Sequence, residues 1–181
     1  MKSAKKILAL ILAGVMALAL LTGCGKATSL NRTVAEGLAE QIKSTLAQVE
    51  NENNISVSYQ VPELSRKIAP LFDENWITKN DRGDAVLNEI YKVNGNKTVK
   101  ETLTDILNPY QSAPFVIFAA ADVTDVKNPV IESSNLINSQ IGFTLDDNDF
   151  DVTSITSLKV AVTHKTINDR TYALAVIIFE K

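Results

Sequence analysis

The C-terminal segment Tyr172-Ala-Leu-Ala-Val-Ile-Ile-Phe179 is apolar at almost every position. A strand with one face in water alternates apolar and polar residues, whereas a strand covered on both faces is apolar throughout. This segment therefore predicts the central strand of a sheet. The rest of the chain then has to supply neighbouring strands and a cover for each face.

The preceding residues predict one of those neighbours. Leu158, Val160 and Val162 alternate with more polar residues, the pattern of a strand buried on one face. Asn168-Asp169 stands between this strand and the apolar segment, and such residues favour a two-residue hairpin turn. The two strands are therefore expected to pair antiparallel.

Further apolar runs lie upstream of this hairpin. Residues 114–120 are continuously apolar and predict another buried strand, and residues 141–145 predict a short one. Between them, residues 129–138 predict a short helix, and residues 146–151 follow as an acidic loop. The positions of this helix expected to face inward are Val130, Leu136 and Ile137.

Helical patterns dominate the N-terminal half. Thr33 and Glu36 have the spacing of a capping box and predict a helix from Thr33 to about Glu50. A second helix is expected from Pro62, with Pro70 kinking or dividing it. Its apolar stripe contains Leu64, Ile68, Leu71, Phe72 and Trp76.

Two more helices are predicted before the first buried strand. One starts at about Asp84, after a turn at residues 80–83, and its apolar positions are Leu87, Ile90 and Tyr91. The other opens at a second capping box, Thr98 to Glu101. Helices first and strands later indicate the α+β class. We expect an antiparallel sheet packed between helices, an α-β-α sandwich with its helices mostly in the N-terminal half.

The beginning of the chain has the pattern of an export signal. Lys2, Lys5 and Lys6 precede an apolar run from Ile7 to Leu20, and Leu21-Thr22-Gly23-Cys24 follows. The apolar run is short for the roughly 20 residues of a spanning helix. The tetrapeptide resembles a bacterial lipobox, whose cysteine is acylated and becomes the first residue of the mature chain.

This resemblance implies a division of the chain and a location. Residues 1–23 would be the lipoprotein signal peptide, 24–32 a tether and 33–181 a single α+β domain. The lipidated Cys24, the only cysteine of the chain, would hold the protein at the cell membrane, facing outside the cytoplasm. One acyl chain binds a membrane only marginally, and a lipoprotein carries several.

Charge argues against one class of partner. Residues 1–23 contain three lysines and no acid, so the other 158 residues have 15 basic and 21 acidic side chains. A net negative domain is not suited to nucleic acid. We expect instead a protein, cell-wall or lipid ligand, and no cofactor.

Few residues have the pattern of a reactive site. His164 is the only histidine, and its spacing suggests no further metal ligands. Asp147, Asp149 and Asp151 have the alternate spacing that begins a calcium loop. Val152 and Leu158 stand where an EF-hand needs glycine and glutamate, so an ordinary acidic loop is the alternative.

Three stretches resemble the CAP superfamily, the cysteine-rich secretory or SCP-like domain. They are the region around Glu50 with Val61–Ala69, the segment Ser133–Phe143, and the closing hairpin with Tyr172 and Phe179. In the middle stretch Asn135, Asn138 and Gly142 fall on positions of a bacterial family motif. The resemblance implies an α-β-α sandwich with a cleft.

The same resemblance implies that this cleft is degenerate. The family's cleft usually has two histidines and two acids, and some members hold a metal there. Glu132 stands at one histidine position, and the region from Trp76 to Asn80 has no histidine for the other. The metal site is therefore not transferred.

These observations lead to one functional hypothesis and two alternatives. The first is a lipid-anchored, non-catalytic CAP-like binding domain at the cell surface. The second is a hydrolase of envelope material that uses carboxylates such as Glu132 with His164. The third is a structural or assembly lipoprotein.

Overall fold

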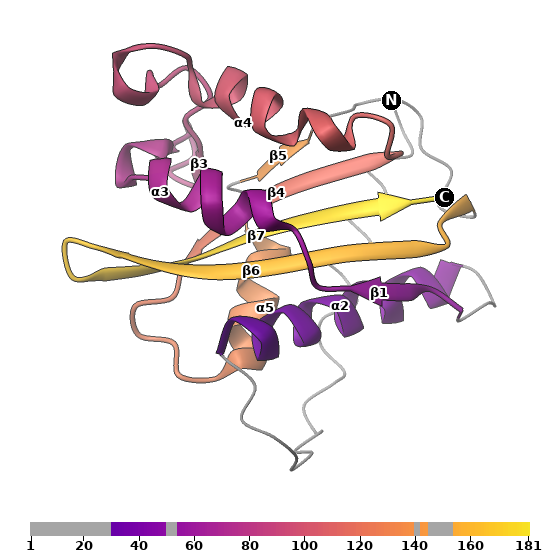
Figure 1. The fold of residues 1–181 in the computed structure, drawn as a ribbon. Helices are drawn as coiled ribbons and strands as arrows, with labels where there is room; N and C mark the ends of the chain where they lie inside the picture. Colours follow the sequence, from indigo (N-terminus) through magenta and orange to yellow (C-terminus); the bar gives the residue numbers. More distant parts are fainter. Residues whose placement is uncertain (1–29, 50–53, 140–141, 145–153) are drawn as a thin grey trace.

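The apolar C-terminal strand lies at the centre of the sheet, as its sequence predicts. In a computed structural model, which describes residues 30–49, 54–139, 142–144 and 154–181, this strand is β7 (Arg170–Glu180). The described strands form a five-stranded sheet in the order β1-β6-β7-β4-β5 (Figure 1). The other members are β1 (Ser56–Ser58), β4 (Phe115–Asp122), β5 (Gly142–Thr144) and β6 (Ser157–Ile167).

The direction of one strand corrects the expected sheet type. β6, β7, β4 and β5 pair antiparallel, as predicted, but β1 runs parallel to β6. The described sheet is therefore mixed and not wholly antiparallel. Helices together with this sheet confirm the α+β class.

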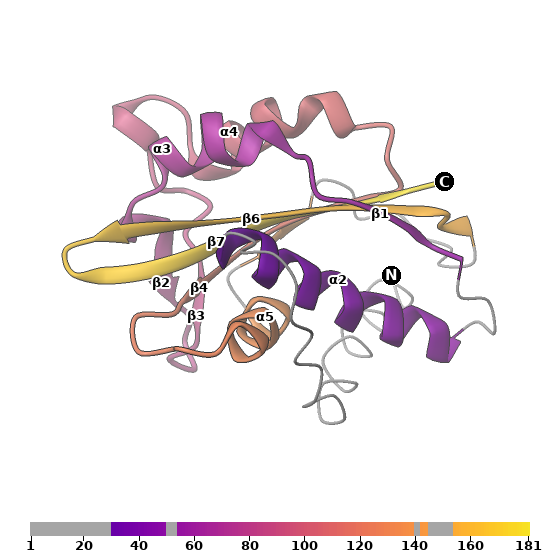
Figure 2. The same ribbon diagram turned by 60° about the horizontal axis from the view of Figure 1, so that its bottom comes forward.

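Each face of β7 contributes to a separate hydrophobic cluster. Ala175, Ile177 and Phe179 pack in a cluster with α2 (Leu30–Val49), whereas Leu174 and Val176 pack in the cluster on the opposite face. Figure 2 shows α2 and α5 (Pro129–Asn138) on one side of the sheet and α3 (Ala69–Leu71) and α4 (Val99–Leu107) on the other. Burial on both faces explains why β7 is apolar throughout.

The first helix begins earlier than its sequence predicts. α2 starts at Leu30, so Thr33 lies in the first turn and is not the N-cap. Glu36 does not close a capping box there. Its Oε1 accepts a hydrogen bond from Nε of Arg32 at 2.7 Å, an ion pair one turn apart.

The helix at residues 129–138 has the predicted bounds, and two of its three expected inner positions, Leu136 and Ile137, pack in the core, whereas Val130 does not. Its N-cap is Asn128, whose Oδ1 accepts from the backbone N–H of Val130 at 2.9 Å. Leu136 is buried as expected, whereas Val130 is 44% exposed. The inner positions nearest the helix start are instead Glu132 and Ser133, both buried.

Two helices on the other face begin where the sequence predicts. Residues Leu64–Ile68 form a π-helix, η2, which leads directly into α3. Pro70 has no N–H to donate, but the helix continues through it to Leu71 and is not divided, and the π-type turn lies just before the proline. Phe72 and Trp76, expected on the same helix, lie beyond its end. α4 starts at the predicted capping box, in which Thr98 and Glu101 each accept from the other's backbone N–H. η5 (Asn108–Tyr110) follows it.

The prediction of a helix from Asp84 is wrong, because a small β-hairpin occupies this region. β2 (Ile77–Lys79) and β3 (Ala85–Leu87) pair antiparallel, between η3 (Glu74–Trp76) and η4 (Val93–Gly95). Oδ1 of Asn80 accepts from the backbone N–H groups of Arg82 and Asp84 and so closes the turn between the strands. Ile90, expected to face inward, is 82% exposed.

The long β6–β7 hairpin is confirmed. Asn168 and Asp169 form its two-residue loop with φ angles of 47° and 63°. Two positive φ values are the signature of a type I′ turn, which matches the twist of the flanking strands. Beside β6, the short β1 pairs only with Ser157–Lys159. Among the described strands, none pairs with the rest of β6 on that side, towards the hairpin (Figure 1).

Candidate functional site

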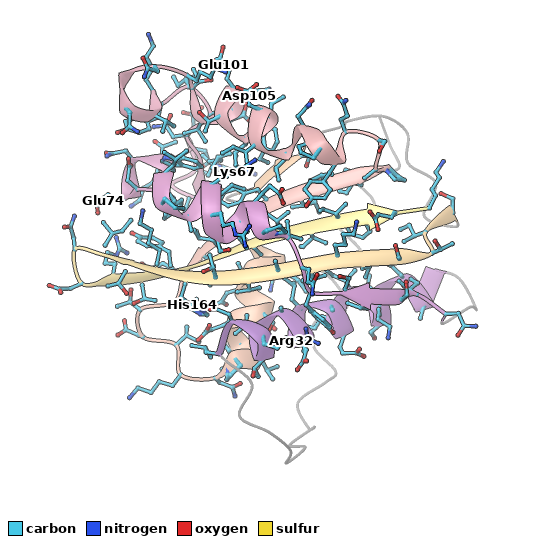
Figure 3. The ribbon with its side chains drawn as sticks, viewed as in Figure 1. Arg32, Lys67, Glu74, Glu101, Asp105 and His164 are labelled. Atoms are coloured by element: carbon cyan, nitrogen blue, oxygen red, sulfur yellow. The ribbon has the colours of Figure 1, made fainter. Side chains whose placement is uncertain are left out.

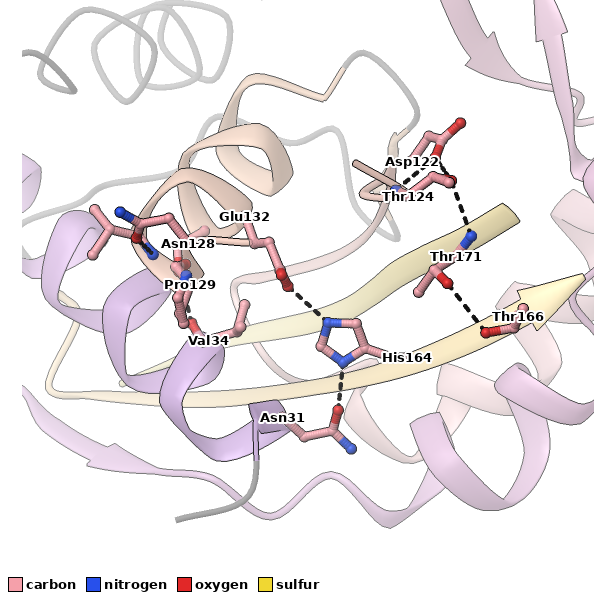
Figure 4. A network of polar contacts seen from close by, with 12 residues as sticks. Asn31, Val34, Asp122, Thr124, Asn128, Pro129, Glu132, His164, Thr166 and Thr171 are labelled. Atoms are coloured by element: carbon pink, nitrogen blue, oxygen red, sulfur yellow. Dashed lines mark hydrogen bonds and ion pairs between the residues drawn. The ribbon is translucent and has the colours of Figure 1, made fainter. Parts of the chain in front are cut away.

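The two candidate residues His164 and Glu132 lie in direct contact. His164 projects from β6 towards α5, and its Nε2 is 2.7 Å from Oε2 of Glu132 (Figure 4). On the other side of the ring, Nδ1 is 2.6 Å from Oδ1 of Asn31 in the first turn of α2. One imidazole thus joins β6 to both helices that cover this face of the sheet.

Glu132 is almost completely buried, and so are the groups beside it. The glutamate is 3% exposed and Ser133 is 0% exposed. Oγ of Ser133 donates to a backbone carbonyl, with Pro129 O at 2.8 Å and Val34 O at 3.0 Å. Gly37 of α2 makes room for this contact, because a Cβ there would lie 2.7 Å from the serine oxygen. The two helices therefore meet at a close approach beside the Glu132–His164 pair.

This geometry suits a structural link better than acid–base catalysis. An imidazolium donates from both ring nitrogens, and here both face oxygen atoms. A hydrolytic base would need one nitrogen directed at a nucleophile. The nearby Ser133 hydroxyl is directed instead at backbone carbonyls of the two helices. The pair brings the predicted residues together, but it presents neither nitrogen to a substrate.

The remaining candidates from the sequence are not part of this arrangement. Cys24 and the acidic residues Asp147, Asp149 and Asp151 lie outside the described residues. Within the described ranges, no three His, Cys, Asp or Glu side chains are close enough together to hold a metal ion. In the same ranges, no helix has both the length and the apolar character needed to cross a membrane.

A groove lies along the edge of the sheet, next to the part of β6 that β1 does not cover. Its volume is about 510 Å³. Residues 161–163 of β6 form one side, and residues 64–66 of η2 form another. The chain from Tyr59 to Pro62, which leaves β1 and enters η2, and Asn31 of α2 complete the lining. Figure 3 shows β6 between Lys67 on η2 and Arg32 on α2.

The described residues that line this groove include one cation and no acid. Arg66 is exposed, and among the described residues no carboxylate lies within ion-pair distance of it. Arg32 stacks on the Tyr59 ring, 3.5 Å from its centroid. Burial, and then the Glu36 carboxylate, raise the pKa of the Tyr59 hydroxyl, although Arg32 acts in the opposite direction. The tyrosine hydroxyl is therefore a neutral hydrogen-bonding group.

A second groove differs in that Lys159 and Glu180, two of the three charged residues in its described lining, form an ion pair with one another, whereas Lys181 completes the charged set. It has a volume of about 460 Å³ and is lined by Tyr110, Lys159 and Glu180 among others. Nζ of Lys159 donates to Oε1 of Glu180 at 2.6 Å, and the hydroxyl of Tyr110 donates to Oε2 of Glu63 at 2.6 Å. The groove beside β6 is the better candidate for an acidic ligand, because its described lining contains Arg66 and no carboxylate, whereas the second groove contains Glu180.

The cleft that the CAP resemblance implies is not assembled. It required Glu132 and the loop after Trp76 to face one another. Glu132 bonds to His164 on the α2 and α5 side of the sheet, whereas Trp76 packs in the hydrophobic cluster on the opposite side. The sheet separates the two positions.

Comparison with known proteins gives no family. No family model matches the chain, and neither a curated protein nor a solved structure matches it.

Sequence reasoning identified the pair but missed the groove. Asn31 falls in the predicted tether, and no local pattern marks Tyr59, Arg66 and Thr163 as binding residues, because they belong to three separate segments. A local signal did exist: Pro62 follows the short strand closely, and a proline limits how far that strand continues. That signal predicts an uncovered stretch on the neighbouring strand but does not say which strand it is.

Proposed function

We propose that this chain is a lipoprotein, held on the outer face of the cell membrane through an acylated Cys24, whose α+β domain binds another molecule of the cell envelope. One observation supports the proposed lipid anchor. The lipobox-like Leu21-Thr22-Gly23-Cys24 follows a short apolar run, and the folded helix α2 begins at Leu30, only six residues after the cysteine.

This spacing restricts where the domain would lie. Six residues span at most about 20 Å even when fully extended. Asn31, which follows at once, lines the groove beside β6. An anchor at Cys24 would therefore keep this groove within reach of the membrane surface and of proteins embedded in it.

The groove supports the binding part of the proposal. It is open and polar and contains an exposed arginine without an ion-pair partner in the described part of the chain. The Glu132–His164 pair, in contrast, is largely buried and faces helices. We therefore place binding at the groove and assign no catalytic role to the pair. A CAP-like cleft is not part of this proposal, because the sheet separates its two sides.

The anchor is tested by a Cys24→Ala variant, with Ser29→Ala as the matched control in the same tether. In cells given radiolabelled palmitate, we expect the parent chain and the control to incorporate label and to sediment with membranes. The cysteine variant should lose the label and move to the soluble fraction. A Cys24→Ala variant that remains in the membrane fraction at the parent level would contradict the anchor.

A further inference from the structure

β6 has an open edge over most of its length. Its eleven residues run from Ser157 to Ile167, but β1 pairs only with the first three. In the described part of the chain, no strand pairs with Val160–Ile167 on that side. An unpaired edge presents backbone N–H and C=O groups that can pair with another strand.

The register shows which backbone groups face outward. In a two-residue hairpin the residues beside the loop, here Ile167 and Arg170, form a hydrogen-bonded pair. Odd-numbered residues of β6 therefore bond to β7, and even-numbered ones face away from it. Just before β6, the carbonyl of Thr156 accepts from the N–H of Ser56 on the β1 side, although the N–H of Thr156 donates to the carbonyl of Glu180, where the ladder begins. Val162, His164 and Thr166 thus present their backbone groups to the open side.

The groove occupies the position that a further strand would take. β1 runs beside β6 as far as Lys159, and then the chain turns away through Pro62 into η2. The groove begins there and has Ala161, Val162 and Thr163 along one side. An extended segment in this groove would occupy the strand position beside β6 that β1 fills only as far as Lys159.

The charge of the groove favours an acidic segment. Arg66 is the only charged residue among the described residues that line it. A second copy of this chain is a poorer occupant, because Lys165 and Arg66 would bring like charges to an edge-to-edge pairing. An acidic partner would meet complementary charge at the same edge.

From these observations we propose that the groove beside β6 binds an extended, acidic peptide segment of a partner protein, which adds to the sheet as a strand next to Val160–Thr166. The peptide backbone would bond to Val162 and His164, and an acidic side chain would pair with Arg66. This mode is strand addition, in which main-chain hydrogen bonds give affinity and side-chain contacts give specificity. The inference names the partner class for the binding domain proposed above, and its location at the membrane surface rests on that proposal.

The test uses two peptides and the full-length chain, purified in a non-ionic detergent. The probes are the capped pentapeptide Asp-Val-Thr-Val-Asp and its counterpart Lys-Val-Thr-Val-Lys. Amide hydrogen exchange is followed by NMR at each residue of β6. With saturating acidic peptide, we expect exchange at Val162 and His164 to slow by at least about tenfold. The amides of Ala161 and Thr163 should change little, because β7 already protects them.

Two variants separate strand addition from a general attraction of charges. Arg66→Glu should weaken binding of the acidic peptide at least about threefold and improve binding of the basic one. Lys67→Glu changes an exposed neighbour on the same helix that does not line the groove, and it should leave both affinities unchanged.

Three outcomes would overturn the inference. The first is failure of the acidic peptide to bind at millimolar concentration, and the second is binding of that peptide that leaves exchange at Val162 and His164 unchanged. The third is a dimer in sedimentation analysis that protects the same amides without peptide, which would assign the edge to a second copy. These results are independent of the anchor. If the chain isolated from cells carries no lipid but binds the acidic peptide, only the proposed anchor is overturned. If that chain carries lipid but does not bind the peptide, only the proposed peptide binding is overturned.

Discussion

Nε2 of His164 on β6 lies 2.7 Å from Oε2 of Glu132 on α5, so one imidazole connects the sheet to a helix packed on it. The same ring reaches Asn31 of α2 through Nδ1. A polar link inside an apolar layer stabilises the fold only while each member keeps its partner. The pair therefore acts as a positioning device for the two helices and, through Asn31, for one end of the groove.

Removing either member of this pair should be costly. Glu132→Ala or His164→Ala leaves a buried polar partner unsatisfied, and we expect each to lower the free energy of unfolding by about 3 kcal/mol. The double variant should lose less than the sum of the two, with a coupling of about 1 to 3 kcal/mol. Urea unfolding followed by circular dichroism measures all three.

The exposed ion pair between Lys100 and Glu89 provides the control for this comparison of single and double variants. Its coupling should not exceed about 1 kcal/mol, because solvent screens it. Additive losses at Glu132 and His164, like those of the control, would show that the contact does not link the sheet to the helix.

The close approach of α2 and α5 gives a second prediction. Gly37→Ala would place a Cβ 2.7 Å from Oγ of Ser133, and this hydroxyl is held by backbone carbonyls of both helices. We expect a loss of about 1 to 3 kcal/mol in the free energy of unfolding, because one helix has to shift. Adding Ser133→Ala to the variant should restore part of the loss, and a single variant as stable as the parent would contradict the packing.

The second groove predicts how stability depends on pH. The hydrogen bond from Lys159, at 2.6 Å, holds the pKa of Glu180 below its ordinary value of 4.5, and Ser157 adds a second bond. A lowered pKa in the folded state means that the contribution to stability is complete above 4.5 and is lost as the pH falls through the lowered value.

Glu180→Gln should therefore be less stable than the parent chain at pH 7, by up to about 1 kcal/mol, because the pair is partly exposed. The difference should shrink as the pH falls below 4.5. Thermal unfolding at a series of pH values measures it. A difference that stays constant from pH 7 to the acid limit would mean that ionisation of Glu180 contributes nothing.

The sheet could be predicted from the sequence where the hydrophobic pattern of a strand matches its burial in the fold. β7 is apolar on both faces and is central, and β6 alternates and has a more exposed edge. Asn168-Asp169 encodes its own turn, since asparagine and aspartate tolerate positive φ better than most residues. These features depend on residues close together in the sequence, and each can be recognised without knowing its partner.

The sequence predictions failed where residues far apart in the chain determine the local structure. Leu87, Ile90 and Tyr91 have helical spacing, yet residues 85–87 pair with 77–79 in a hairpin closed by Asn80. The groove combines segments from residues 31 to 163, so no local pattern reveals it. Glu132 and His164 were predicted to act together in the hydrolase alternative, but the geometry of their contact depends on how α5 packs on β6.

The most direct test of the account is mass spectrometry of the N-terminal peptide of the chain isolated from membranes. We expect the mature chain to begin at Cys24 and this residue to carry a diacylglyceryl group. A chain recovered with an unmodified Cys24, or with residues 1–23 still attached, would contradict it.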